Sequence, residues 1–179
     1  MGGKQRFLVM HDYGMGGWCW WIRARSVREI RETFREVEVV DDAETVDRAE
    51  RNPHIEEVDI DAEAMPPVLD GLREEREAQR EKAGFGTFAE RGVLYLRRRW
   101  DTDVPEMFLF EVGADGRRLR EVQLTEDGPW LKSDAEDWPI NAPIVDFYDP
   151  ELVDQEIGRD EFEAAWVRAE WDPERQVNA

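Results

Sequence analysis

The sequence predicts an α+β fold made of two small units, each an antiparallel or mixed sheet with helices packed on one face. Three observations support this prediction. Short runs of strand length recur in both halves of the chain, and segments with apolar residues at helical spacing separate or follow them. Asp-Gly turn signals punctuate the second half. The glycines Gly84 and Gly86 mark a boundary, which gives an N-terminal unit over residues 1–83 and a C-terminal unit over residues 91–171.

The first half is predicted to alternate strands and helices, with strands at 6–11, 18–25, 37–40 and 55–60 and helices at 27–36, 42–51 and 68–82. The first helix has the clearest start, because Ser26 and Glu29 match the capping box. In this motif the serine side chain caps the helix and the glutamate reaches back toward the cap. The last helix follows Pro66 and Pro67 and has a thin apolar stripe, so its far end is expected to project into solvent.

The second half is predicted to be mostly strands closed by one helix, with strands at 93–100, 107–112 and 119–125 and the helix at 159–171. The turn at Ala114–Gly116 joins the second and third of these strands into a hairpin. In the helix, Phe162, Trp166 and Ala169 share one face. We expect this face to cover the second sheet, with Trp166 as a large buried ring.

The charge of the chain restricts its partners. Its net charge is −19, and the acids are concentrated: residues 41–77 hold fourteen acids and four bases, and residues 126–174 hold sixteen acids and three bases. A negative field repels phosphate backbones, so nucleic acid is not expected as a partner. The same field would attract a basic protein. Solubility in a crowded cytoplasm is the alternative explanation for this composition.

The residue types present also restrict the chemistry. A single cysteine excludes an internal disulfide and favours the reducing cytoplasm. With two histidines beside it, a structural metal site is not expected, and nothing indicates a cofactor. The chain has no apolar run of membrane-spanning length and no charged-then-apolar leader, so no membrane association is expected.

The most unusual stretch is HDYGMGGWCWW, at residues 11–21. A phosphate-binding glycine loop needs a helix after it, because the helix N-terminus supplies the N–H groups. Here strand-like sequence follows Gly17, and the loop lysine is absent. We therefore interpret Gly14, Gly16 and Gly17 as a hairpin turn, in which at least one glycine has a positive φ.

Two kinds of site could be built at this hairpin. A catalytic site would use His11, Asp12 and Cys19, and His11 and Cys19 could be neighbours across the hairpin. A buried structural cysteine is the more common arrangement. A binding site would use the aromatic residues Tyr13, Trp18, Trp20 and Trp21.

The tryptophans divide between the two faces of the predicted strand. Trp18 and Trp20 share one face, and Trp21 lies on the other with Cys19. Trp21 is then either an exposed interface anchor or part of a second packed face. In the second case the Ser26 helix covers one face and the C-terminal unit covers the other.

Residues 93–171 carry a further pattern, formed by Trp100, Asp103–Pro105, Phe108–Glu111, Arg120–Val122, Asp127–Gly128 and Glu161–Trp166. In this pattern, which covers under half the chain, the sequence resembles an uncharacterised bacterial single-domain family. The small acidic members of that family imply an interaction or immunity-type role. Family members often have a histidine after the strand tryptophan. Asp101 and Thr102 occupy that place here, so the resemblance gives no candidate functional residue. Residues 1–90 resemble other uncharacterised bacterial proteins, with no function attached.

Three functions follow from these observations. The first is an acidic interaction protein, of the immunity or inhibitor type, that binds a basic protein partner. The second is a small enzyme that uses the HDYGMGGWC hairpin. The third is a small-ligand module with a tryptophan-lined pocket.

Overall fold

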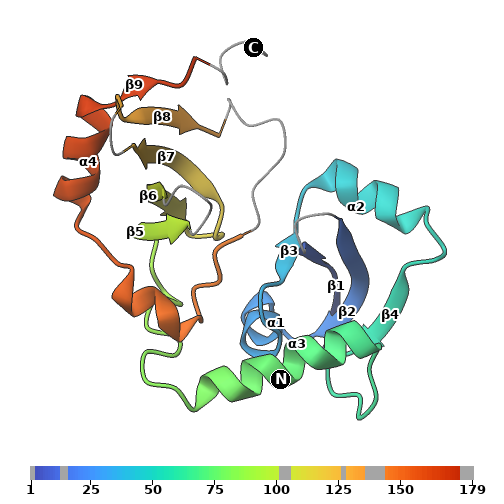
Figure 1. Cartoon of the computed structure of the whole chain (residues 1–179). Coiled ribbons are helices and arrows are strands. Elements are labelled where there is room, and N and C mark those ends of the chain that lie inside the picture. The colour runs from blue at the N-terminus through green and yellow to red at the C-terminus, as the bar shows by residue number, and fades with distance from the viewer. Residues whose placement is uncertain (1–2, 13–15, 101–105, 126–127, 136–143, 174–179) are drawn as a thin grey trace. The chain divides into compact units, whose positions relative to one another are not determined.

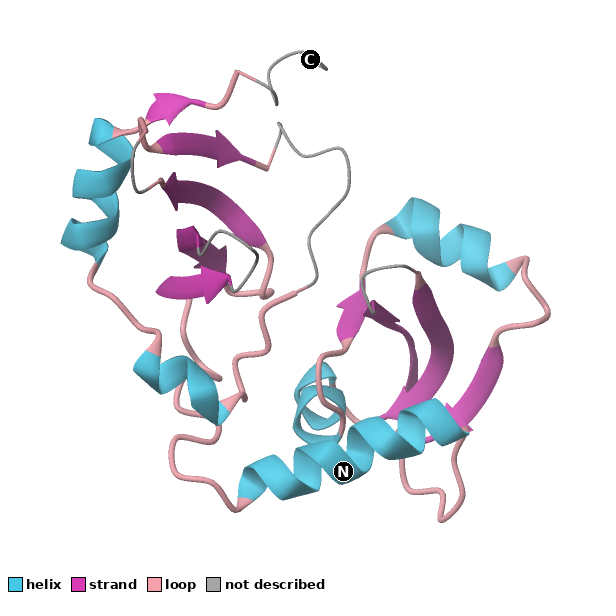
Figure 2. Ribbon diagram, in the orientation of Figure 1, coloured by secondary structure: helices cyan, strands magenta, loops and turns pink. Residues whose placement is uncertain are grey.

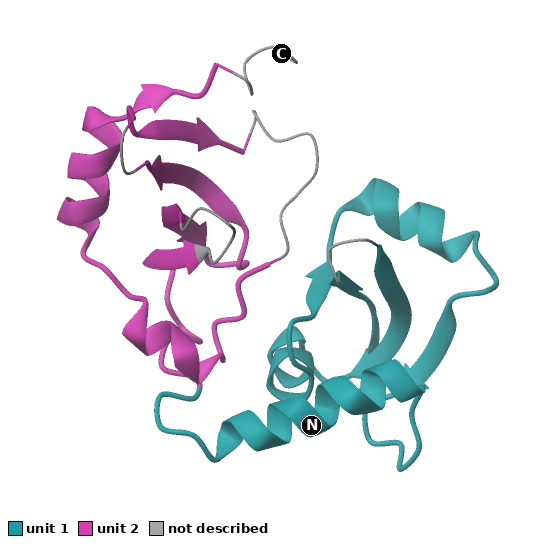
Figure 3. Cartoon of the chain, viewed as in Figure 1, with its two compact units in different colours: residues 1–85 teal, residues 86–179 magenta. Residues whose placement is uncertain are grey.

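The computed structural model describes residues 3–12, 16–100, 106–125, 128–135 and 144–173. The chain divides into two compact units, residues 1–85 and 86–179 (Figure 3), and each is described by itself. Each unit contains one sheet with helices against it (Figure 2), which confirms the predicted α+β class. Within the described ranges, no helix combines the length and the apolar character needed to cross a membrane.

The sheet of the first unit has the strand order β3-β1-β2-β4 (Figure 1). Its strands are β1 (Gln5–Asp12), β2 (Gly17–Ala24), β3 (Glu38–Val40) and β4 (Glu56–Asp59). β1 and β2 form the predicted antiparallel hairpin, and β3 pairs antiparallel with the other side of β1. β4 pairs parallel with β2 and is last in the strand order, so it is an edge strand.

The first helix, α1 (Val27–Thr33), begins at the predicted cap. The backbone N–H of Glu29 donates to the Ser26 hydroxyl oxygen at 3.1 Å. The Glu29 carboxylate accepts a hydrogen bond from the backbone N–H of Arg25 at 2.6 Å, one residue before the position expected in a capping box. The helix ends at its C-cap Phe34, two residues before the predicted end, where the phenyl ring is fully buried.

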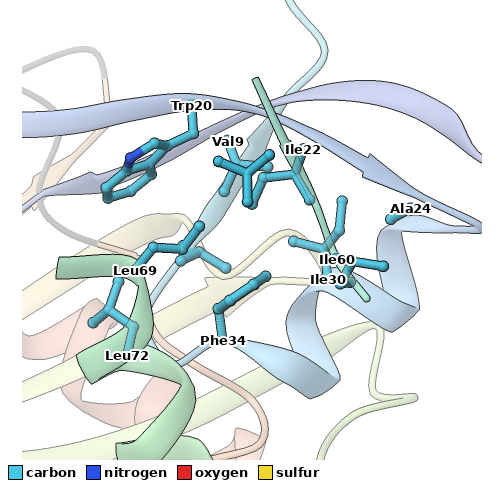
Figure 4. Packing of buried hydrophobic residues seen from close by; sticks show 11 residues of the cluster. Val9, Trp20, Ile22, Ala24, Ile30, Phe34, Ile60, Leu69 and Leu72 are labelled. Carbon is cyan, nitrogen blue, oxygen red and sulfur yellow. The ribbon is translucent and has the colours of Figure 1, made fainter. Parts of the chain in front are cut away.

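Helices cover both faces of the first sheet, whereas the sequence predicted one. On one face, Val9, Trp20 and Ile22 pack against α1 and α3 (Pro67–Arg80), as Figure 4 shows. On the other face, Leu8 and Trp21 pack against Ala49 of α2 (Ala43–Glu50). Alternation along the two central strands explains this arrangement, because successive side chains in both strands are apolar and each face needs a cover.

One face of the far end of α3 is buried, so this end does not project freely into solvent as predicted. Arg76 is 1% exposed. Its guanidinium donates to the Phe34 carbonyl oxygen at 2.9 Å and to Gln79 Oε1 at 2.8 Å. Because Phe34 ends α1, its carbonyl group needs a partner outside that helix, and the arginine supplies one. The long arginine side chain thus replaces the apolar residues that α3 lacks in this turn.

The second unit has the strand order β5-β6-β7-β8-β9. Its strands are β5 (Val93–Trp100), β6 (Glu106–Gly113), β7 (Arg118–Leu124), β8 (Leu131–Asp134) and β9 (Glu170–Trp171). The first four pair antiparallel, and β9 pairs parallel with β8. The sequence did not predict β8, β9 or the 3₁₀ helix η1 (Pro150–Asp154). In the β6–β7 turn, Gly116 has φ 87°, and a Cβ there would lie 2.5 Å from the Val145 carbonyl oxygen.

Both faces of the second sheet are packed as well. One apolar cluster includes Phe108, Phe110 and Leu152. The other lies under α4 (Arg159–Arg168) and includes Leu109, Val122 and Phe162. Phe162, which is fully buried, is the main anchor of the helix. Trp166 is only partly buried, contrary to the prediction, and its ring stacks on the Phe162 ring at a centroid distance of 6.2 Å.

Candidate functional site

The β1–β2 hairpin determines where the predicted catalytic residues point. In its register, His11 lies opposite Trp18 and Met10 lies opposite Cys19. Residues opposite each other share a face of the sheet, and adjacent residues alternate. His11 and Cys19 therefore lie on opposite faces and cannot act on the same substrate atom. The two residues are one register position apart in the hairpin, but their side chains do not form a histidine–cysteine pair.

The surroundings of these side chains are those of structural residues. His11 Nδ1 lies 3.0 Å from the Glu36 carbonyl oxygen, a hydrogen bond to the loop before β3. Glu36 has φ 50°, an unusual value for a residue other than glycine. Burial raises the pKa of the Cys19 thiol, which is the opposite of the change that activates a nucleophile. Asp12 is exposed at the end of β1, on the face opposite His11.

In the glycine turn, the structure describes Gly16 and Gly17. Gly16 has φ 148°, a value that residues other than glycine rarely adopt. This confirms that at least one of the three glycines has a positive φ. Gly17 begins β2, where a Cβ would lie 3.3 Å from the His11 carbonyl oxygen. Tyr13 and Gly14 lie outside the described residues.

The tryptophans of the hairpin do not line a common pocket. Trp20 is 3% exposed and Trp21 is 6% exposed, and they belong to the cores on opposite faces. The Arg6 guanidinium lies 3.9 Å from the centroid of the Trp21 ring, so Trp21 is not an exposed anchor. Its cover is α2 of the same unit, where the sequence had suggested the C-terminal unit. Trp18 is the exposed one, at 50%, and it stacks on Trp20 at 6.4 Å.

The acidic residues do not form a metal site in the part of the chain that the structure describes, where no group of three His, Cys, Asp or Glu side chains could hold an ion. Asp59 and Asp61 instead share the Lys4 ammonium, at 2.6 Å for Asp61. Hydrogen bonds from Arg25 and then Lys4 lower the pKa of Asp61 to about 2.

The most distinctive surface of the first unit is formed by residues 41–57. Its seven acidic side chains are all exposed, and we call them the α2–β4 acidic surface: Asp41, Asp42, Glu44, Asp47, Glu50, Glu56 and Glu57. Six of them lie on α2, just before it, or on the sheet face that α2 covers, and Glu56 extends the surface around the β4 edge to the opposite face. Four of the seven have local roles. Asp42 caps α2, and hydrogen bonds from Thr45 hold the pKa of its carboxyl below the usual value. Ion pairs join Glu44 to Arg48, Glu50 to Arg6, and Glu57 to Arg6 and Arg23.

The other three acids of this surface are Asp41, Asp47 and Glu56. None of them has an ion-pair partner among the residues that the structure describes. The two contacts of Glu57 are long, at 3.8 Å each, and screened by solvent. The surface therefore keeps a net negative field.

The sequence located this charge but not its arrangement. The acid count over residues 41–77 indicated an acidic region, but part of that region is neutralised by residues from β1 and β2, such as Arg6 and Arg23. These pairings depend on the sheet order, which the sequence did not predict. Comparison with protein-family models, with curated proteins and with solved structures finds no match for this chain.

Proposed function

We propose that this protein acts by binding a basic protein partner through the α2–β4 acidic surface, in an interaction of the inhibitor or immunity type. One observation carries the proposal: Asp41, Asp47 and Glu56 are exposed and have no ion-pair partner within the described residues. Their charge is therefore available to a partner. Complementary charge raises the rate of encounter with a basic protein and disfavours partners of the same sign, including the phosphate backbone of nucleic acids.

The two other functions have less support from the same residues. An enzyme at the hairpin would need His11 and Cys19 on one face of the sheet, and the register places them on opposite faces. A tryptophan-lined ligand pocket would need Trp20 and Trp21 to be accessible, and both are at least nine-tenths buried. We also propose a cytoplasmic location, supported by the single, partly buried thiol of Cys19.

The first experiment identifies the partner and locates the contact. The whole chain, carrying an affinity tag, is used to capture proteins from its native host, and each captured protein is then purified and tested alone. A triple variant of the acidic surface, Asp41→Asn, Asp47→Asn and Glu56→Gln, removes three charges without breaking an ion pair among the described residues. We expect it to bind the purified partner several-fold more weakly than the unmodified protein.

A matched control separates this surface from net charge. Glu151→Gln, Asp154→Asn and Glu170→Gln remove the same number of charges from exposed positions of the second unit. We expect this control to bind nearly as well as the unmodified protein, and so should His11→Ala and Cys19→Ser. Equal weakening in both triple variants would mean that only net charge matters. Loss of binding in His11→Ala or Cys19→Ser, with the fold retained, would move the site to the hairpin.

A further inference from the structure

The edges of the two sheets differ in what they pair with. The outer edge of β5 is already used: Leu96 forms a bridge with Glu156, and the Arg97 N–H donates to the Gln155 carbonyl oxygen at 2.7 Å. β9 has two residues and β3 has three, so each offers fewer backbone groups to an added strand than β4 does. β4, with four residues, is the longest edge in the described chain without a further strand beside it (Figure 1).

The backbone of β4 presents unused hydrogen-bonding groups on this edge. The Ile60 N–H donates to the Arg23 carbonyl oxygen at 3.1 Å, so every second residue before it, Val58 and Glu56, also directs its backbone groups toward β2. Glu57 and Asp59 therefore direct theirs outward. The Asp59 carbonyl oxygen accepts from the Ala62 N–H at 2.9 Å. The Glu57 N–H and C=O and the Asp59 N–H have no backbone partner among the described residues.

The side chains of β4 determine which strand could pair there. Glu56, Glu57 and Asp59 are exposed, and only Val58 is buried. A second copy of this chain would place acids opposite acids, which destabilises a strand pair. A strand with lysine or arginine two positions apart would instead face Glu57 and Asp59 on one side of the sheet. Glu56 would offer a further contact on the opposite side.

We propose that β4 receives an extended basic segment of the protein partner as an added strand, an inference that rests on the proposed function and specifies its contact. Main-chain hydrogen bonds to Glu57 and Asp59 supply affinity, and the acidic side chains select a basic sequence. Four residues are a short edge. Beside this short edge, Glu56 is exposed and has no ion-pair partner among the described residues, so its charge adds to the attraction without further backbone pairing.

The test uses a synthetic probe whose charge and strand pairing are varied separately. The probe is an acetylated and amidated peptide of eight residues, alternating lysine and valine, with a fluorescent label. The control peptide has the same sequence with alternate backbone amides N-methylated, so that it keeps its charge but cannot donate to Glu57. Binding to the whole chain is measured by fluorescence anisotropy, and amide hydrogen exchange of β4 is followed by NMR.

We expect the unmethylated peptide to bind several-fold more tightly, because the control cannot donate the backbone hydrogen bond to the Glu57 carbonyl oxygen. The Glu57 and Asp59 amides should become protected when it binds, whereas the Val58 amide, already bonded to β2, should change little. Glu57→Pro removes the outward N–H without removing a hydrogen bond to β2. It should lower the affinity for the unmethylated peptide toward that for the control peptide. Glu57→Gln keeps the backbone N–H and should lower the affinity for both peptides equally.

Three results would overturn the inference: equal affinity of the two peptides, unchanged protection of the Glu57 amide, or no binding of the unmethylated peptide. The proposed function fails separately. If the acidic-surface triple variant loses the natural partner while the two peptides bind equally, the acidic surface binds by charge alone and only the added strand is rejected. If that variant keeps the natural partner, the proposed function is rejected whatever the peptides do.

Discussion

The ring of Phe162 should be the main contribution of α4 to the stability of the second unit. It is 0% exposed, it lies 5.3 Å from the Tyr95 ring, and it packs beside Leu109 and Val122. Truncation by Phe162→Ala should therefore cost about 3–5 kcal/mol. Trp166, one turn later, is only partly buried, so Trp166→Ala should cost less, about 1–2 kcal/mol.

Hydrogen exchange followed by mass spectrometry can measure both costs in the whole chain, because it reports the opening of each unit separately. The opening free energy of β6 and β7 should fall by these amounts, and that of β1 and β2 should not change. If Phe162→Ala unfolds the second unit completely, Phe162→Leu gives a smaller and measurable loss. This account of α4 would be refuted if Trp166→Ala lowered the opening free energy as much as Phe162→Ala or more, or if neither Phe162 variant lowered it.

Three further predictions concern local structure. Ser26→Ala should cost about 1 kcal/mol through the lost helix cap, measured as reduced protection of α1, and unchanged protection would contradict the capping geometry. Gly116→Ala should destabilise the second unit, since its Cβ would lie 2.5 Å from the Val145 carbonyl oxygen; an unchanged midpoint of thermal unfolding would contradict the close approach. The Asp61 carboxyl should titrate near its pKa of about 2 in an NMR experiment. Because this pKa is below the unfolded value of about 3.9, its contribution to stability should be complete above pH 4 and be lost as the pH falls through 2. Arg25→Gln should move the titration upward, and an unchanged midpoint would mean that the ion pair does not form.

The sequence predicted the elements that depend on local signals. The cap at Ser26 located the start of α1, and alternating apolar runs located β1, β2, β5, β6 and β7. It did not predict β8, because Leu131–Asp134 has no apolar alternation and forms a strand only by pairing with β7. β9 is two residues long and pairs with a strand 39 positions earlier, so no local pattern could reveal it. The burial of Arg76 depends on a carbonyl group of another helix, which is again a non-local cause.

In the candidate site, the same non-local causes limit what the sequence predicts for individual side chains. Sequence alternation correctly separated Trp20 from Trp21, but the relation of His11 to Cys19 depends on the register across the hairpin. A slip of one residue would exchange the faces of every side chain in one strand. The observed register places apolar side chains on both sheet faces, and the cover of the second face by α2 was not predicted.

The most direct test of the proposed binding mode is the association rate of the purified partner, measured by stopped-flow fluorescence over a range of ionic strength. The Debye length falls from about 10 Å at 0.1 M salt to about 3 Å at 1 M, so attraction to the α2–β4 acidic surface should weaken over this range. We predict that the association rate falls steeply with salt, and that the Asp41, Asp47 and Glu56 triple variant lowers this rate more than it raises the dissociation rate. The matched triple variant of the second unit should behave like the unmodified protein. A salt-independent association rate, or the same rate for all three proteins, would contradict the account.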